Sequence, residues 1–128
     1  MKIKFIIVLI IIPFIVKAQE IKQITSVEAN KLIDSLDIEK TVIIDARDSL
    51  SFKNGHIKNA LNIDAFKENA QEKLTKHLNK ENIIIYCTFN RRCIKMIGIL
   101  QNLNFKGVIY NMNEGINAWK QKGYEIVQ

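Results

Sequence analysis

The sequence has 128 residues, a length that fits a single domain, and its 19 Lys and Arg against 13 Asp and Glu give a net charge of +6. Lys2, Lys4 and Lys17 all lie in the segment 1–18, so the segment 19–128 carries 16 basic and 13 acidic side chains, a net charge of +3. An excess this small gives no reason to expect a nucleic-acid partner, and the spacing of the Cys, His, Asp and Glu residues predicts no metal site.

The segment 1–18 has the pattern of a secretory signal peptide. Lys2 and Lys4 give a basic start, an unbroken apolar run follows from Phe5 to Val16, and the small residue Ala18 stands where a signal peptidase would cut. The run is shorter than the roughly 20 apolar residues that span a bilayer. We therefore predict a signal peptide at 1–18 and a domain at 19–128 that is exported, periplasmic or secreted, and has no membrane contact after cleavage. An uncleaved anchor is the alternative.

Strand and helix patterns alternate along the predicted domain. Thr25 and Glu28 have the spacing of a capping box, and the apolar residues behind them recur at helical spacing. Short runs that are continuously apolar are instead typical of strands buried on both faces. In chain order the sequence predicts a strand over 21–24, a helix over 26–36, a strand over 41–44, a helical turn over 49–53, extended segments over 56–57 and 60–63, a helix over 65–78, a strand over 83–86, a helix over 92–103, a strand over 108–110, a helix that begins at 113–115 and ends at Gly123, and a strand over 124–127.

This alternation predicts an α/β domain with a parallel type of sheet covered by helices on both faces. In such sheets the ligand site lies beyond the carboxyl ends of the strands. Asp45 follows one buried strand and Cys87 follows another, so we expect both at this edge. Gly98 in the helix over 92–103 is expected to let that helix approach a strand closely.

The segment from Cys87 to Arg92 carries the strongest functional signal. A strand that ends in a tight loop and opens a helix gathers backbone N–H groups in one concavity, and the helix dipole adds positive potential there. Both effects, with Arg91 and Arg92 beside them, stabilise the thiolate form of Cys87. The sequence therefore predicts an activated sulfur nucleophile in an anion-binding loop made of Thr88, Phe89, Asn90, Arg91 and Arg92.

Four motifs along the chain resemble those of single-domain rhodaneses, which are sulfurtransferases. In order they are the strand 42–47 that ends in Asp-Ala-Arg, the segment 52–60 with Gly-His-Ile-Lys-Asn-Ala, the loop 84–92 with Cys, four residues and Arg, and the segment 113–124 with Gly, Trp and Gly-Tyr. The resemblance covers residues 21–127 and implies a rhodanese-like fold, with a central, mostly parallel five-stranded sheet flanked by helices on both faces. Asn90 departs from the family, because many active members have glycine there.

The resemblance also implies a reaction and residue roles. Cys87 attacks the sulfane sulfur of a small anionic donor such as thiosulfate and forms a persulfide. The outer sulfur then passes to a thiol acceptor, of a small molecule or of a protein, or to cyanide. Arg92 closes the loop and holds the anion, Arg91 is a rim charge, and Asp45 and Arg47 brace the loops. No metal or organic cofactor is implied. The related phosphatases have a loop one residue longer, so Arg92 favours sulfur transfer.

Cys93 allows two interpretations, and one of them implies a second class of function. It lies on the apolar stripe of its helix, so it is either a packed core thiol or a partner that forms a reversible disulfide with Cys87. In the second case the protein is a thiol–disulfide redox protein, although the spacing is not Cys-x-x-Cys. A non-catalytic rhodanese-like binding module is the third alternative.

Overall fold

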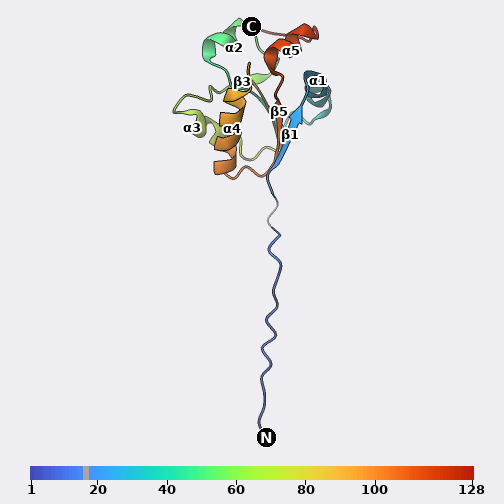
Figure 1. Ribbon diagram of the computed structural model, residues 1–128, viewed down its shortest axis with the longest axis vertical. Coiled ribbons are helices and arrows are strands. Elements are labelled where there is room, and N and C mark those ends of the chain that lie inside the picture. The colour runs from blue at the N-terminus through green and yellow to red at the C-terminus, as the bar shows by residue number, and fades with distance from the viewer. Residues whose placement is uncertain (16–17) are drawn as a thin grey trace.

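The computed structural model describes residues 1–15 and 18–128, and strands and helices alternate along the chain from Glu20 onward (Figure 1). Val16 and Lys17, which belong to the predicted cleavage site, lie outside the described residues. The elements are β1 (Glu20–Ile24), α1 (Ser26–Ser35), β2 (Thr41–Asp45), α2 (Ser49–Asn54), β3 (Ala60–Asn62), α3 (Ala70–Thr75), β4 (Asn82–Tyr86), α4 (Arg91–Asn102), β5 (Val108–Met112) and α5 (Gly115–Gln121).

The five strands form one sheet in the order β1-β5-β4-β2-β3, and every neighbouring pair is parallel. The predicted α/β class and five-stranded sheet are confirmed. The central strands β2 and β4 pair over their whole length, from Thr41 opposite Asn82 to Asp45 opposite Tyr86. Their carboxyl ends therefore meet at one edge, and the residues that follow them face the same region of the molecule.

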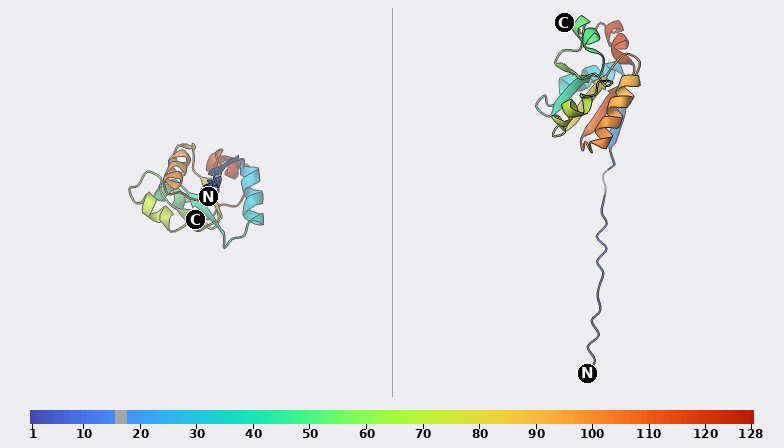
Figure 2. Two further views of the ribbon diagram at one scale, coloured as in Figure 1. Left: turned by 90° about the horizontal axis from the view of Figure 1, so that it is seen from below. Right: turned by 90° about the vertical axis from the view of Figure 1, so that its left-hand side faces the viewer.

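Helices cover both faces of the sheet (Figure 2). The alternate residues Ile83 and Ile85 of β4 pack in one hydrophobic cluster with side chains of α3 and α4. Ile84 and Tyr86 point to the other face and pack in a second cluster with side chains of α1 and α5. This alternation explains why the strand reads as a continuous apolar run in the sequence.

The predicted capping box at the start of α1 is present. The Thr25 side chain accepts a hydrogen bond from the backbone N–H of Glu28, and the Glu28 carboxylate accepts one from the backbone N–H of Thr25. A second acidic side chain, Glu114, accepts hydrogen bonds from the backbone N–H and the hydroxyl of Ser26. The start of α1 is thereby joined to the residue just before α5.

The predicted helix over 65–78 is wrong in its extent, because only Ala70–Thr75 is helical. The Asp64 side chain accepts a hydrogen bond from the backbone N–H of Phe66, and the N–H of Lys67 bonds back to the Asp64 carbonyl. These contacts hold the chain in turns before α3. The spacing of Phe66 from the apolar residues of α3 therefore does not reflect a common helical face.

Two further expectations also fail. The predicted strand over 124–127 does not join the sheet, since its Val127 forms only an isolated antiparallel bridge to His56. A Cβ atom at Gly98 would have no neighbour within 4 Å outside its own helix, so this glycine does not serve a close approach to a strand.

Residues 1–15 have no regular secondary structure and their large apolar side chains are exposed. Figure 1 draws them as an extended trace. Within the part of the chain that the structure describes, no helix combines the length and the apolar character that crossing a bilayer requires.

Candidate active site

The loop between β4 and α4 consists of Cys87, Thr88, Phe89 and Asn90, and it lies at the carboxyl edge of the sheet. Asn90 has a left-handed backbone with φ of +68°, a conformation that Asn tolerates better than most residues with a side chain. Its side-chain oxygen accepts a hydrogen bond of 2.9 Å from Asn111 at the end of β5. The Asn90 side chain therefore ties the loop to a neighbouring strand.

A pocket of about 140 Å³ opens at this loop. Its walls come from the loop, from the first turn of α4 and from the turn before α3, and they are Phe66, Cys87, Thr88, Phe89, Arg91 and Arg92. Cys87 is only 1% exposed, so a reagent reaches its sulfur through this pocket. Pockets for drug-sized ligands measure roughly 300–1,000 Å³, so this one suits a small anion or the tip of an acceptor chain.

The pKa of the Cys87 thiol is lowered to about 6. The largest cause is the hydrogen bond from the Cys93 thiol, and backbone N–H groups of Cys93, Asn90 and Arg92 lower it further, against the opposing effect of burial. The lowered pKa has the direction that we expected, and backbone N–H groups contribute as expected, but the largest contribution comes from a neighbouring thiol that we did not include beside the helix dipole and the two arginines. At neutral pH the sulfur is mainly the nucleophilic thiolate.

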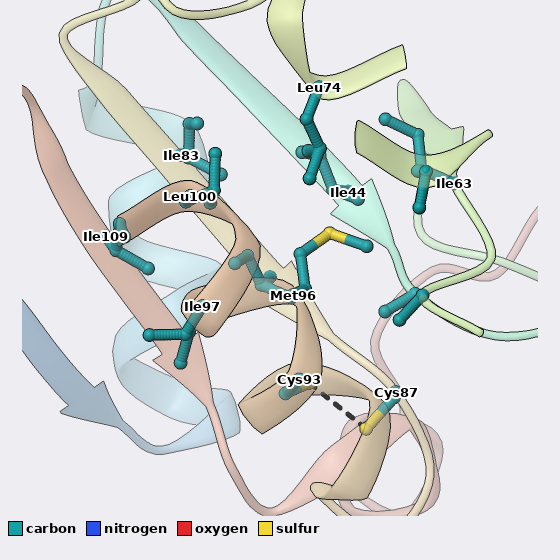
Figure 3. Close-up of a cluster of buried hydrophobic side chains, with 14 of the residues drawn as sticks. Ile44, Ile63, Leu74, Ile83, Cys87, Cys93, Met96, Ile97, Leu100 and Ile109 are labelled. Carbon is teal, nitrogen blue, oxygen red and sulfur yellow. Dashed lines mark hydrogen bonds between the residues drawn. The ribbon is translucent and has the colours of Figure 1, made fainter. Parts of the chain in front are cut away.

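Cys93 stands in the first turn of α4, fully buried, and its sulfur lies 3.1 Å from that of Cys87. Figure 3 shows the pair at one end of the hydrophobic cluster that contains Met96 and Leu100. The bond to the Cys87 sulfur and burial both raise the pKa of Cys93, which therefore keeps its proton and acts as the donor. Both cysteines are free thiols.

The two arginines reach the pocket from the first turn of α4. The Arg92 guanidinium lies over the Phe66 ring, 4.7 Å from its centroid, and its Nε is 3.7 Å from a carboxylate oxygen of Asp64. That Nε is buried and has no hydrogen-bond partner. Arg91 is exposed and lies 6.0 Å from the same ring. Both positive charges thus border the pocket, and both lie near the Phe66 ring, which attracts cations.

Asp45 and Arg47 lie outside the pocket wall and are joined to each other. Both are buried, and their ion pair is 2.7 Å long. The Arg47 guanidinium also donates to the backbone carbonyl of Gly55, and the Asn62 side chain donates to the carbonyl of Arg47. The pair therefore joins the end of β2 to the segment between α2 and β3, and the Asn62 contact joins the Arg47 backbone to β3.

Three residues that contribute to the site were not expected from the sequence. Asn111 holds the loop through Asn90, Phe66 forms a pocket wall and stacks with the arginines, and Asp64 pairs with Arg92. Asn111 had a signal, because a polar residue near the carboxyl end of a buried strand points to the ligand edge. Phe66 and Asp64 had none, since an irregular turn brings them there.

Two further findings concern the described residues outside this pocket. Residues 1–15 and 18–128 contain no group of three or more His, Cys, Asp or Glu side chains placed to hold a metal ion. A larger apolar pocket of about 240 Å³ lies against Thr41, at the amino end of β2, with Leu36 and Leu61 in its wall, but no cysteine lines it. The pocket at Cys87 is therefore the better candidate for a reactive site.

The fold and this loop define an α/β domain that places a thiol of lowered pKa at a small pocket bordered by two arginines. The family model of the rhodanese-like domain matches residues 28–122. The chain therefore belongs to the rhodanese-like domain family.

Individual relatives agree with this assignment. A tRNA uridine(34) hydroxylase of Yersinia pestis (strain Pestoides F) is 30% identical over 102 residues, covering 77% of this chain and 28% of the relative. The chain thus spans little more than a quarter of the length of the curated relatives that it matches. A Bacillus halodurans protein of known structure is 27% identical, with a TM-score of 0.66 over 83% of this chain and 76% of that one. A thiosulfate sulfurtransferase of Pseudomonas aeruginosa shares the fold at 18% identity, with a TM-score of 0.64 over 84% of this chain and 20% of that one.

Proposed function

We propose that the protein is an exported sulfurtransferase that carries sulfane sulfur as a persulfide on Cys87. The observation that carries this proposal is the Cys87 sulfur itself, which has a lowered pKa and meets a small pocket bordered by two arginines. The donor is a small anion of the thiosulfate kind, and the acceptor is either a thiol, of a small molecule or of a protein, or cyanide. No cofactor takes part in this scheme.

The reaction has two half-reactions. The Cys87 thiolate attacks the outer, sulfane sulfur of thiosulfate, the sulfur–sulfur bond of the donor breaks, and sulfite leaves with the electron pair. Arg91 and Arg92 favour entry of the dianion and stabilise the departing sulfite, while the loop N–H groups stabilise the persulfide. An acceptor thiolate or cyanide then takes the outer sulfur and regenerates the Cys87 thiolate, which predicts ping-pong kinetics.

The test is a thiosulfate:cyanide assay on reduced protein, combined with intact mass spectrometry. We expect thiocyanate to form, and we expect an adduct of about 32 Da on Cys87 after thiosulfate alone, since covalent catalysis leaves the intermediate on the enzyme when the acceptor is absent. Cys87→Ser is the control and should show neither. Reduced wild-type protein that acquires no adduct would contradict the proposal and favour a non-catalytic binding module.

A dithiol redox protein remains the second candidate, because the two sulfurs are 3.1 Å apart. The variant Cys93→Ser separates the two functions. A dithiol oxidoreductase needs both sulfurs and loses all turnover in this variant, whereas sulfur transfer to cyanide needs Cys87 alone. Formation of thiocyanate by Cys93→Ser therefore favours the sulfurtransferase.

Export is supported by the sequence of residues 1–18, which has a basic start and an apolar run of signal-peptide length. We expect cell fractionation to find the protein outside the cytoplasm, and N-terminal sequencing of that protein to begin at Gln19. Protein that is recovered with Met1 in place, in the cytoplasm or in the membrane, would contradict this part of the proposal.

A further inference from the structure

The two cysteines of this chain form a buried pair whose second member lowers the pKa of the first but takes no covalent part in the sulfur transfer described above. The chain has only these two cysteines. Cys87 meets the pocket, while Cys93 does not line it and is fully buried behind the loop. The sulfurs are nevertheless 3.1 Å apart, about 1 Å more than a disulfide bond of roughly 2.05 Å. Figure 3 shows this contact as the dashed line between them.

We propose that Cys93 resolves the Cys87 persulfide, releasing sulfide and leaving a Cys87–Cys93 disulfide. This inference rests on the proposed function, because it needs sulfane sulfur on Cys87. It adds a second fate for that intermediate: when no acceptor arrives, the protein ends the reaction by itself and waits for a thiol reductant.

The placement of the two sulfurs suits the attack. Thiol–disulfide exchange is a displacement in which the nucleophile approaches one sulfur and the other sulfur leaves. Because Cys87 is 1% exposed and its open side is the pocket, the outer sulfur of the persulfide has to lie in the pocket. Cys93 reaches the inner sulfur from the interior, so the nucleophile and the leaving sulfur lie on different sides of it.

The step balances without an added oxidant. A bond forms between the Cys93 and Cys87 sulfurs, and the bond between Cys87 and the outer sulfur breaks. The electron pair of that bond leaves with the outer sulfur, which also takes the Cys93 proton and departs as hydrosulfide. The outer sulfur is reduced from sulfane sulfur to sulfide, and the two cysteines are oxidised together to the disulfide.

Protonation of the Cys93 thiol, which is favoured first by its hydrogen bond to the Cys87 sulfur and then by burial, sets the order of the two fates. The raised pKa of Cys93 keeps its sulfur protonated and makes it a weak nucleophile, so an acceptor thiolate in the pocket reacts first. The disulfide afterwards needs a dithiol reductant to restore activity, which in an oxidising compartment has to be supplied.

The experiment uses the purified, reduced protein under anaerobic conditions, with thiosulfate and sodium tetrasulfide as separate sulfur sources and no acceptor. For wild type we expect an adduct of about 32 Da that is then lost, a final mass about 2 Da below the reduced protein, released sulfide, and a peptide that links Cys87 to Cys93. For Cys93→Ser, which keeps a hydroxyl donor, we expect the adduct to remain. Cys93→Ala should keep it too, and wild type without a sulfur source should keep its reduced mass.

The outcomes separate the two proposals. If the adduct on the wild-type protein persists and the Cys93 thiol can still be alkylated, the resolving step is wrong and the sulfurtransferase proposal stands. The resolving step is also wrong if Cys93→Ser loses the adduct as fast as the wild-type protein does. Disulfide formation and sulfide release from tetrasulfide, but no reaction with thiosulfate, supports the resolving step and contradicts the donor proposed above. If neither thiosulfate nor tetrasulfide leaves an adduct on Cys93→Ser, both the sulfurtransferase proposal and the resolving step are contradicted.

Discussion

Cys87 is a buried side chain that carries a charge, and its immediate neighbours compensate for the loss of water. A buried thiolate without partners would have a raised pKa, whereas this one has a pKa of about 6 because the Cys93 thiol and three backbone N–H groups favour the charged form. The folded pKa lies below the ordinary value of 9.0. The contribution of this group to stability is therefore present above the ordinary value and lost as pH falls through about 6.

This shift predicts the pH dependence of Cys87 alkylation. The rate with iodoacetamide under reducing conditions should rise to half its maximum near pH 6, and it should fall about tenfold for each pH unit below that because only the thiolate reacts. Cys93→Ala removes the largest cause of the shift. A hydrogen bond to a charged group contributes about 1.5–3 kcal/mol, so the midpoint of the alkylation rate of Cys93→Ala should lie about one to two pH units above that of wild type.

Cys93→Ser is the matched control, because its hydroxyl still donates to the Cys87 sulfur. Its midpoint should stay within about half a pH unit of the wild-type value, as expected when one donor replaces another. An unchanged midpoint in Cys93→Ala would show that the thiol at residue 93 does not set the charge of Cys87, and that the backbone N–H groups suffice.

At the scale of elements, the ion pair of Asp45 and Arg47 joins β2 to the loop that follows α2. Its two side chains are 0% and 7% exposed, and Arg47 bonds to the carbonyl of Gly55 as well. Arg47→Met would leave the Asp45 charge buried and unpaired, so the free energy of unfolding in urea should fall by about 3–5 kcal/mol.

Two further variants test whether the loss of stability comes from the unpaired Asp45 charge. Lys53→Met removes an exposed cation of α2 and should change stability by less than about 0.5 kcal/mol. The double variant Asp45→Asn with Arg47→Met removes both charges and should recover part of the loss, because no unpaired charge remains. A loss below about 1 kcal/mol in Arg47→Met alone would mean that water reaches Asp45 in the folded protein.

The elements also show what the sequence allows one to predict. The buried strands were predictable, because Val42–Ile44 and Ile83–Ile85 are continuous apolar runs and only a sheet covered on both faces hides them. The place of Cys87 at the edge of the sheet was predictable because this residue follows such a strand. The pocket wall was not: Phe66 keeps the spacing of a helix but lies in a turn held by Asp64, and local hydrogen bonds override an apolar pattern.

The cause of the Cys87 charge was predictable only in part, because the sequence suggested backbone N–H groups and a possible approach of Cys93 to Cys87 but not that the Cys93 thiol would contribute most. Residues 87 and 93 are six positions apart, and whether their sulfurs meet depends on the left-handed turn at Asn90 that starts α4. The Asn90 side chain is itself held by a hydrogen bond from Asn111, which is distant in the sequence. Chain spacing predicts which residues share an edge, whereas contacts of 3 Å depend on backbone angles that it does not specify.

At the scale of the whole molecule, the last helix supports the loop that carries Cys87. The backbone N–H of Ile116 donates to the carbonyl of Cys87, and Gly115 at the start of α5 lies directly against Thr88. Gly115 has φ of +81°, and a Cβ atom there would overlap the carbonyl oxygen of Thr88 and come within 3.0 Å of that of Cys87. The glycine of the closing sequence motif therefore allows the two segments to meet.

Gly115→Ala should consequently damage the site more than the fold. The left-handed backbone alone costs a residue with a side chain roughly 1–2 kcal/mol. The overlap has to be relieved by moving Thr88, and a displacement of about 1 Å at a reacting group can cost about a hundredfold in rate. We expect persulfide formation from thiosulfate to slow by about that factor, while circular dichroism still shows a folded protein.

Gly98→Ala is the control for the Gly115 variant. A Cβ atom at Gly98 has no neighbour outside its own helix, so alanine there should raise stability by about 0.5–1 kcal/mol and leave the rate unchanged. Equal rates in Gly115→Ala and wild type would show that α5 does not position the Cys87 loop.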